Sequence, residues 1–172
     1  ILALASATGK KAKEMAEKWN AEYITNDYQK IINDKRINLV ICATRHSSHG
    51  RIAEEALKAD KNLYIEKPLV LNETELKKVM KAAEFSKGRL LVGFNRRFSV
   101  HFKKAKEVFA GRSAPLVILY RVNMPSLERG HWSYKQEEGG RLIGEACHFV
   151  DALNFLTGSK PSRVKASGVP LG

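Results

Sequence analysis

The sequence has few of the residues that mark secreted, disulfide-bonded or membrane-embedded proteins. Only two cysteines, Cys42 and Cys147, occur among the 172 residues. Both stand in apolar surroundings without a second Cys or a His at zinc-ligand spacing, so we expect buried free thiols in a reducing compartment and no metal site. The apolar opening run ILALASA is too short for a membrane span and lacks a basic leader. These absences predict a cytoplasmic protein that does not enter a membrane.

Acidic residues are also scarce, because 18 Asp and Glu stand against 30 Lys and Arg, a net charge of +12. An excess of this kind is typical of proteins that bind nucleic acid. The lysines, however, fall on separate helical segments and alternate with Glu, as they do on solvated helix faces. We therefore predict no nucleic-acid partner. Salt-dependent retention on DNA would indicate the opposite.

What the sequence does contain is 44% hydrophobic residues, enough for the core of one domain and part of another. Apolar runs of strand length alternate with amphipathic segments, which predicts right-handed crossovers and a parallel sheet. Because these runs are apolar throughout, they favour a sheet covered on both faces. The runs are ILALASA, INLVICAT, NLYIE and RLLVGF. The first begins at Ile1 with nothing before it to pair with, so we expect a piece of a longer protein.

Helical patterns fill the gaps between these strands, with helices expected at residues 10–20 and 48–59. Asp27 is a candidate N-cap of a short helix. Asn72 is the candidate N-cap of a later helix and precedes Glu75 by three residues, the spacing of a capping box. The apolar stripes of the first helix and of the helix after Asn72 are Ala12, Met15, Ala16 and Trp19, and Leu76, Val79, Met80 and Ala83, respectively.

Near Phe98 the pattern changes, so we divide the chain into a first domain, residues 1–98, and a second, residues 99–172. The second has a helix rich in Lys and Phe, a long strand-like run LVILYRVNM, and the amphipathic segment GGRLIGEACHFVDALNFLTG. Gly158 and Pro161 are the stop signals of that helix. A final run, SRVKASGV, also has the pattern of a strand.

Long polar side chains follow three of the predicted strands. In a parallel sheet the carboxyl ends of the strands lie at one edge, where ligands bind, so these side chains are expected to converge on one crevice. Glu66 and Lys67 are adjacent on an extended chain and should serve different partners, while Pro68 fixes the backbone behind them. The side chains are Thr44, Arg45 and His46, then Glu66 and Lys67, then Asn95, Arg96 and Arg97.

Glu66-Lys67-Pro68 after a strand, then a helix and VGFNRRF, and later GGRLIGEACHFVDALNFLTG, together resemble the Gfo/Idh/MocA family of nicotinamide-dependent oxidoreductases. The resemblance covers nearly all of the chain. It implies a Rossmann domain that binds NAD or NADP, followed by an α+β domain with a mostly antiparallel sheet that supplies the substrate pocket. The family often associates through that sheet, so a homo-oligomer is one expectation.

The resemblance also implies roles for single residues. Lys67 would contact the nicotinamide ribose and the substrate hydroxyl, and His148 would be the general acid or base, with Asp151 beside it on the same helix face. The alternative for His148 is a satisfied core histidine. The candidate cofactor-binding residues are Ser6, Thr8, Thr44, Arg45, Glu66, Lys67 and Arg96, and the candidate substrate-binding residues are Asn95, Arg97 and Trp132.

The sequence also departs from the family pattern. A dinucleotide fold opens with a strand and a G-x-G-x-x-G turn, which this sequence lacks, so we expect it to begin at the second strand. Many members carry an Asp four residues before the His and a Gly two before it, where Gly144 and Ala146 stand here, with Glu145 adjacent. The second strand ends without an acid, near Ser6, Thr8 and two lysines, which favours NADP over NAD.

These features together predict an enzyme that moves hydride between NAD(P) and a carbinol of a sugar, sugar nucleotide or cyclitol. The alternative is a non-catalytic ligand-binding fragment, because the pyrophosphate loop is absent from these residues.

Overall fold

Strands and helices alternate through the first half of the chain, as predicted. The computed structural model describes residues 1–125, 127–128 and 130–168, with the backbone alone for residues 9–11. The strand Tyr23–Thr25 was missed, because a run of only three residues gives little periodicity. The elements are β1 (Ala3–Ala5), α1 (Gly9–Trp19), β2 (Tyr23–Thr25), α2 (Tyr28–Asn33), β3 (Leu39–Cys42), α3 (His46–Lys58), β4 (Asn62–Ile65), α4 (Glu73–Phe85) and β5 (Leu90–Val92).

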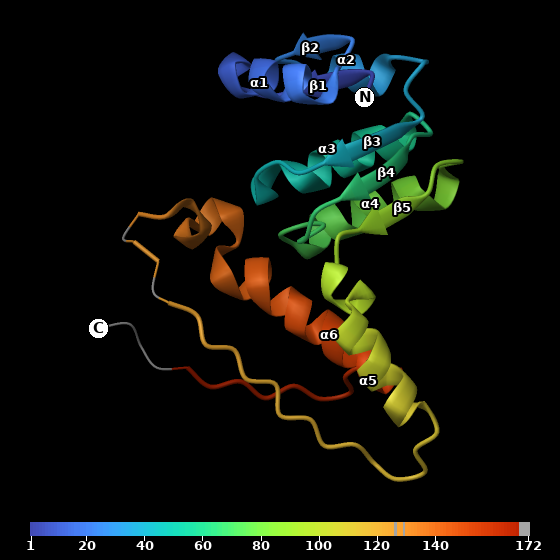
Figure 1. Cartoon of the computed structure of the whole chain (residues 1–172), viewed down its shortest axis with the longest axis vertical. Coiled ribbons are helices and arrows are strands. Elements are labelled where there is room, and N and C mark those ends of the chain that lie inside the picture. Colours follow the sequence, from blue (N-terminus) through green and yellow to red (C-terminus); the bar gives the residue numbers. More distant parts are fainter. Residues whose placement is uncertain (126, 129, 169–172) are drawn as a thin grey trace.

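Every strand pair is parallel, which confirms the prediction, but the strands form two sheets. β1 pairs with β2, and β3, β4 and β5 form a second sheet in that order. Figure 1 shows β1, β2, α1 and α2 as one layer beside the three-stranded sheet. The parallel register places the carboxyl ends of β3, β4 and β5 at one edge of their sheet.

The hydrophobic core lies between the three-stranded sheet and helices α3 and α4. Leu57 of α3 and Val79 of α4 pack with Leu63 and Ile65 of β4, and all four are fully or almost fully buried. On the other face Leu39, Ile41 and Leu91 are 50%, 68% and 51% exposed. The expectation of a sheet covered on both faces is therefore wrong for the described residues, because helices cover only one side.

The helix caps follow the sequence closely. The Asp27 side chain accepts from the Gln29 N–H at 2.9 Å, and the Asn72 side chain accepts from the Glu75 N–H at 2.9 Å. Glu75 itself turns back to the N–H of Leu71, at 3.1 Å, so the predicted capping box is displaced by one residue.

The predicted apolar stripes are only partly buried. Ala12 and Val79 are buried, whereas Met15, Trp19 and Met80 are 45%, 50% and 62% exposed. The two short strands β1 and β2 offer α1 too little surface to cover its whole stripe.

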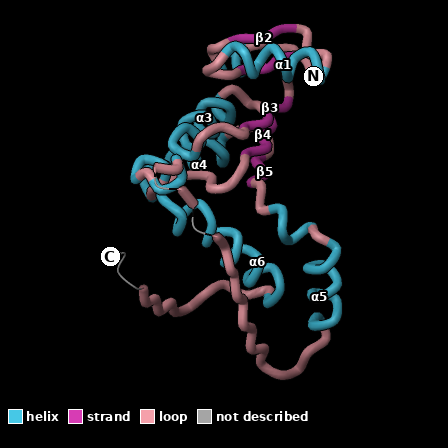
Figure 2. The backbone as a smooth tube through the Cα atoms, turned by 60° about the vertical axis from the view of Figure 1, so that its left-hand side comes forward, coloured by secondary structure: helices cyan, strands magenta, loops and turns pink. Residues whose placement is uncertain are grey.

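The second unit is built mainly of helices in the described residues. α5 lies beside α6 in both views of the backbone (Figures 1 and 2). Gly158, with a φ of 68°, ends α6 as the sequence indicated. The elements after β5 are η1 (Asn95–Phe98), at the end of the first unit, and then α5 (Val100–Ala110), η2 (Trp132–Tyr134), η3 (Gln136–Glu138), the π-helix η4 (Leu142–Ala146) and α6 (Cys147–Thr157).

The predicted strands of the second unit do not form within the described residues. Residues 116–124 run without strand pairing, and Val117 and Leu119 are 94% and 92% exposed. Residues 162–168 are likewise unpaired, and the last residue of that run, 169, lies outside the described part. An extended segment forms a strand only beside a partner, and no strand after β5 is present in the described residues.

Both cysteines are free, as predicted, with Cys42 buried and Cys147 half-buried. Burial raises the pKa of each thiol, which keeps it protonated. Within the described ranges, no helix is both long and apolar enough to cross a membrane.

Candidate active site

The loops after β3 and β4 form one wall of a cavity of about 380 Å³. The opposite wall is the segment that contains η2 and η4 of the second unit, so residues far apart in the sequence meet here. The lining includes Thr44, His46, Glu66, Lys67, Trp132 and Glu145. The expected convergence of strand-end side chains is therefore present for β3 and β4.

Lys67 joins the two walls of the cavity. Its ammonium Nζ donates to the carbonyl oxygen of Gly144 at 2.6 Å and lies 3.2 Å from the Glu145 carboxylate. The side chain is 15% exposed, so both interactions are sheltered from bulk water. The peptide bond between Lys67 and Pro68 is cis.

The side chains of Glu66 and Lys67 have different partners, as expected. Its carboxylate accepts from the Tyr64 hydroxyl at 3.3 Å and from the backbone N–H of Lys67 at 3.3 Å. It also lies against Gly93, where a Cβ atom would stand 3.1 Å from Glu66 Oε1 and 3.0 Å from the Tyr64 hydroxyl. A carboxylate held at the cavity wall can accept hydrogen bonds from a ligand hydroxyl.

His148 is buried in the first turn of α6 and carries an unpartnered ring nitrogen. In the described residues, its Nδ1 is the one buried side-chain polar atom that lacks a hydrogen-bond partner. Burial lowers the pKa of His148, and the charges of Lys67 and Arg96 lower it further, while Glu145 and Glu66 raise it. His148 does not itself line the cavity, but it lies within electrostatic reach of the charges that do.

Asp151 pairs with Arg97 and not with His148. The guanidinium of Arg97 donates from Nε to Asp151 Oδ2 at 3.0 Å and from Nη2 to the other carboxylate oxygen. This ion pair raises the pKa of Arg97, chiefly through the hydrogen bonds to Asp151. The expected contact between Asp151 and the imidazole is absent from the described residues, because the nearby Arg97 provides a stronger, bidentate partner.

The loop after β3 docks onto the second unit through aromatic and charged contacts. The Arg45 guanidinium lies 4.2 Å from the ring centroid of Trp132, and the His46 ring lies edge-on to the same indole at 5.0 Å. A predicted cofactor residue and a predicted substrate residue therefore stack on each other. Thr44 Oγ1 lies 2.7 Å from the Ser48 hydroxyl at the start of α3.

Glu138 holds the same loop from the other side. Its carboxylate accepts from the Ser47 N–H at 3.1 Å and from the Ser47 hydroxyl at 3.0 Å, and its carbonyl oxygen lies 3.0 Å from His46 Nδ1. Glu138 is 7% exposed. Its carboxylate thus satisfies a free amide in the first turn of α3, where the helix dipole favours negative charge.

The remaining predicted residues lie elsewhere. Ser6 and Thr8 stand after β1, in the other sheet, where the Ser6 hydroxyl donates to the Thr8 carbonyl at 3.1 Å. Arg96 donates to the Tyr120 hydroxyl at 2.7 Å and lies over the Phe149 ring at 4.8 Å. Asn95 begins η1, outside the cavity lining.

The sequence did not predict Glu138 and Glu145 as site residues, although Glu145 lines the cavity and Glu138 holds the loop after β3. Glu145 lies on the π-helix η4, where five residues form a wider turn than an α-helix allows. Helical spacing therefore misplaces its side chain. The only signal in the sequence was an acidic residue beside the position where the family pattern has Asp.

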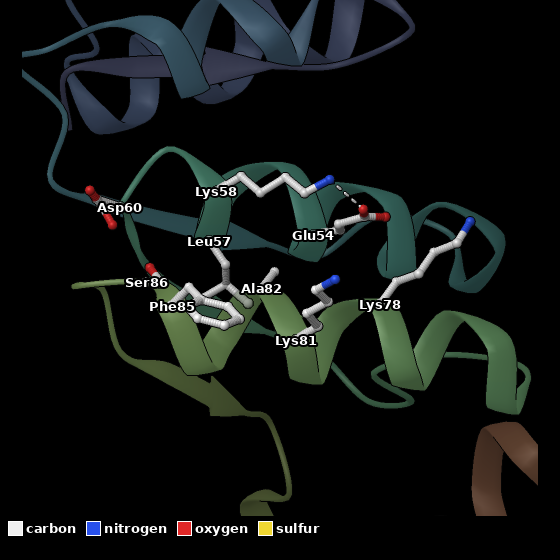
Figure 3. Close-up of a pocket in the computed structure, with 9 residues that line it drawn as sticks. All are labelled: Glu54, Leu57, Lys58, Asp60, Lys78, Lys81, Ala82, Phe85 and Ser86. Carbon is white, nitrogen blue, oxygen red and sulfur yellow. Dashed lines mark hydrogen bonds and ion pairs between the residues drawn. The ribbon is translucent and has the colours of Figure 1, made fainter.

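A second hollow, of about 450 Å³, lies between α3 and α4 on their outer side (Figure 3). Figure 3 shows Lys58 paired with Glu54, and Lys78, Lys81 and Phe85 at successive positions along α4. Its lining includes none of the predicted site residues, so the cavity at the strand ends is the better candidate. Among the described residues, no group of three or more His, Cys, Asp or Glu side chains is placed to hold a metal ion.

Comparison with known proteins shows which family the chain resembles. Residues 1–94 match the model of the Gfo/Idh/MocA family, an oxidoreductase family with an NAD-binding Rossmann fold. The uncharacterized oxidoreductase YrbE of Bacillus subtilis is 28% identical over 171 residues, which cover 99% of this chain and 50% of YrbE. Myo-inositol 2-dehydrogenase of Thermotoga maritima is 25% identical over 168 residues, or 98% of this chain and 50% of that protein.

Among solved structures, a levoglucosan dehydrogenase in complex with NADH and levoglucosan is similar, with a TM-score of 0.70 and 25% identity. The match covers 90% of this chain and 44% of that one. The chain therefore spans about half the length of the curated relatives it matches.

Proposed function

This chain belongs to the Gfo/Idh/MocA oxidoreductase family, and on that premise we propose that the protein transfers hydride between NAD(P) and a carbinol of a sugar, sugar nucleotide or cyclitol. The observation that carries the proposal is Lys67, whose ammonium lies at the strand-end cavity beside Glu145 and within electrostatic reach of His148. The similar proteins named as dehydrogenases of myo-inositol and levoglucosan support a polyol or sugar as the substrate class.

The residues around the cavity fit a nicotinamide cofactor by their chemistry. The hydroxyl of Thr44 and the carboxylate of Glu66 are groups that bind ribose hydroxyls. When bound, the nicotinamide accepts the hydride. Carboxyl ends of parallel strands are where such ligands bind in open sheets of this kind.

Lys67 and His148 divide the work on the substrate hydroxyl. The Lys67 ammonium donates to the hydroxyl oxygen and stabilises the negative charge that grows there as hydride leaves the carbon. We assign the general-base role to His148, which is neutral because its pKa is lowered and which lies outside the cavity lining. Nδ1 of His148 has no competing partner among the described residues, as a proton acceptor requires.

We infer in addition that NADP is preferred over NAD. The first turn of α1 contains no acidic residue, and Thr8 at its N-cap makes no side-chain capping bond. A 2'-phosphate near Ser6 and Thr8 would therefore meet the positive end of the helix without a repelling carboxylate.

The test is turnover by the protein and its variants. A panel of inositols, aldoses and sugar nucleotides is supplied with NADP or NAD, and the absorbance of the reduced nicotinamide is followed. We expect Lys67→Met and His148→Asn each to lower kcat/KM about 100-fold to 10,000-fold. Lys78→Met, which removes the same charge from the outer face of α4 (Figure 3), should stay within about twofold.

Two outcomes contradict the proposal. Folded Lys67→Met that turns over its substrate as fast as the native protein would remove Lys67 from the chemistry. Tight NADPH binding with no turnover of any member of the panel would favour the non-catalytic binding protein instead.

A further inference from the structure

His49 is a fully buried histidine that stands between the two strand-end loops of the cavity. It lies in the first turn of α3 and has no exposed surface. Its Nδ1 is 2.7 Å from the carbonyl oxygen of Pro68, and its Nε2 is 3.2 Å from the carbonyl oxygen of Thr44. One ring therefore touches the loop after β3 and the loop after β4.

We infer that His49 is a positioning residue that holds the Lys67-Pro68 backbone in place from α3. This inference rests on the proposed function for its catalytic consequence but not for its structural one. Pro68 directly follows Lys67 and is buried, so its carbonyl oxygen needs a donor from the protein. His49 supplies that donor at the shorter of its two contacts.

The ring nitrogens have different tasks in this arrangement. A carbonyl oxygen only accepts hydrogen bonds, so a ring nitrogen that bonds to one must carry a proton. Nδ1 makes the shorter contact, 2.7 Å from the Pro68 oxygen, and Nε2 lies 3.2 Å from the Thr44 oxygen. The loop that carries Lys67 should therefore depend on Nδ1 and little on Nε2.

For Lys67, the contact fixes the position of the backbone from which its long, flexible side chain extends. Its ammonium makes its contacts with Gly144 and Glu145 on the far wall of the cavity. If the backbone at Pro68 shifts, the ammonium moves away from these partners and from a hydroxyl bound between the walls. A displacement of about 1 Å can cost catalysis on the order of 100-fold.

Two near-isosteric substitutions separate the ring nitrogens. The amide nitrogen of Asn occupies roughly the place of Nδ1, and that of Gln roughly the place of Nε2. His49→Asn should keep the donor to Pro68, whereas His49→Gln and His49→Leu should lose it. Thermal unfolding of each variant establishes that it is folded at the assay temperature.

The first measurement needs no activity. Each protein is treated with an amine-selective acylating reagent, and the rate at which single lysines are modified is followed by mass spectrometry. We expect Lys67 to react about tenfold faster in His49→Gln than in the native protein. In His49→Asn, its rate should stay within about threefold of the native rate. Lys61, a buried lysine bound to the carbonyls of Asp34 and Ile37, is the internal control and should not change.

The second measurement is kcat against cofactor affinity. In His49→Gln, kcat should fall about 10-fold to 100-fold while the Kd of NADPH changes less than about threefold, and His49→Asn should restore most of kcat. A general loss of stability would instead lower kcat and weaken NADPH binding together, or it would change neither.

The outcomes keep the two proposals apart. Equal Lys67 reactivity in the native protein, His49→Asn and folded His49→Gln overturns the inference about His49, whatever the activity. Faster Lys67 labelling in His49→Gln, in a protein whose native form turns over no polyol, supports the positioning role and overturns the proposed function.

Discussion

At the scale of single residues, charged side chains of the cavity lining act on the buried, unpartnered imidazole of His148, which lies outside that lining. Burial lowers the pKa of His148, and the charges of Lys67, in the loop after β4, and Arg96, in η1, lower it further. Glu145 from η4 and Glu66 after β4 act in the opposite direction. The balance keeps the ring neutral at neutral pH, because an unperturbed histidine titrates near pH 6.5.

We expect His148 to titrate below pH 6.5 in the folded protein. The ring proton signals of His148 in an NMR titration, assigned by their loss in His148→Asn, measure this directly. Glu145→Gln removes a charge that raises the pKa and should move the titration to still lower pH. Arg96→Gln removes a charge that lowers it and should move the titration upward. A titration at or above pH 6.5 in the native protein would contradict the charge balance.

The same shift fixes the sign of the pH dependence of stability. The unfolded chain takes up a proton on His148 near pH 6.5, while the folded chain does so only at lower pH. The contribution of neutral His148 to stability is therefore complete above pH 6.5 and is lost as the pH falls from 6.5 toward the lower folded pKa. The acidic limb of kcat/KM for alcohol oxidation should lie below pH 6.5 for the same reason.

At the scale of secondary-structure elements, α3 connects most parts of the site. Its N-terminal turn carries His46, Ser47 and His49, and these three contact η2 and η3 on one side and the loop after β4 on the other. Helix N-termini need acceptors, and here the acceptor is Glu138 of the second unit. The cap of one helix is thus also a contact between the two units.

Glu138→Ala should lower the free energy of unfolding by about 1–2 kcal/mol, because Ser47 loses its acceptor at the helix start. Glu138→Gln keeps an acceptor and loses the charge, so about 0.5–1 kcal/mol is expected. Urea denaturation measures both. Trp132 fluorescence should move to longer wavelength in Glu138→Ala as the segment that packs on His46 loosens.

The neighbouring Glu137 provides the matched control. Its side chain is 66% exposed and pairs with Lys135 at 3.6 Å, so Glu137→Ala should cost less than about 0.5 kcal/mol. If Glu137→Ala and Glu138→Ala destabilise the protein equally, the capping role of Glu138 is wrong.

The elements also show which features local sequence can predict. The strands β3 and β4, the caps Asp27 and Asn72 and the stop at Gly158 depend on a few adjacent residues, so the sequence alone predicted them. The run of residues 116–124 has the same strand propensity, but a strand needs a partner, and none is present in the described residues. The pairing of Asp151 with Arg97 and of Lys67 with Glu145 joins residues 54 and 78 positions apart, which no local pattern specifies.

At the scale of the whole molecule, the predicted cofactor residues lie on two separate sheets. Ser6 and Thr8 follow β1, whereas Thr44, Glu66 and Lys67 follow strands of the other sheet (Figure 1). The proposed cofactor would therefore have to contact both sheets. The net charge of +12 adds a general attraction for its phosphates.

Cofactor choice should therefore depend on the end of β1. We expect the protein to bind NADPH more tightly than NADH, because α1 begins without an acidic residue in its first turn. Ser6→Asp places a carboxylate where a 2'-phosphate would lie and should weaken NADPH binding about tenfold or more, with little loss or a gain for NADH. Fluorescence titrations with both nucleotides give the four dissociation constants.

Ser162→Asp makes the same change of net charge at an exposed position of the second unit and should leave the NADPH to NADH ratio unchanged. An equal loss of NADPH affinity in Ser162→Asp and Ser6→Asp would mean that net charge, and not the end of β1, selects the phosphate. Tighter binding of NADH than of NADPH by the native protein would overturn the NADP preference itself, and the N-terminus of α1 would then have no part in cofactor choice.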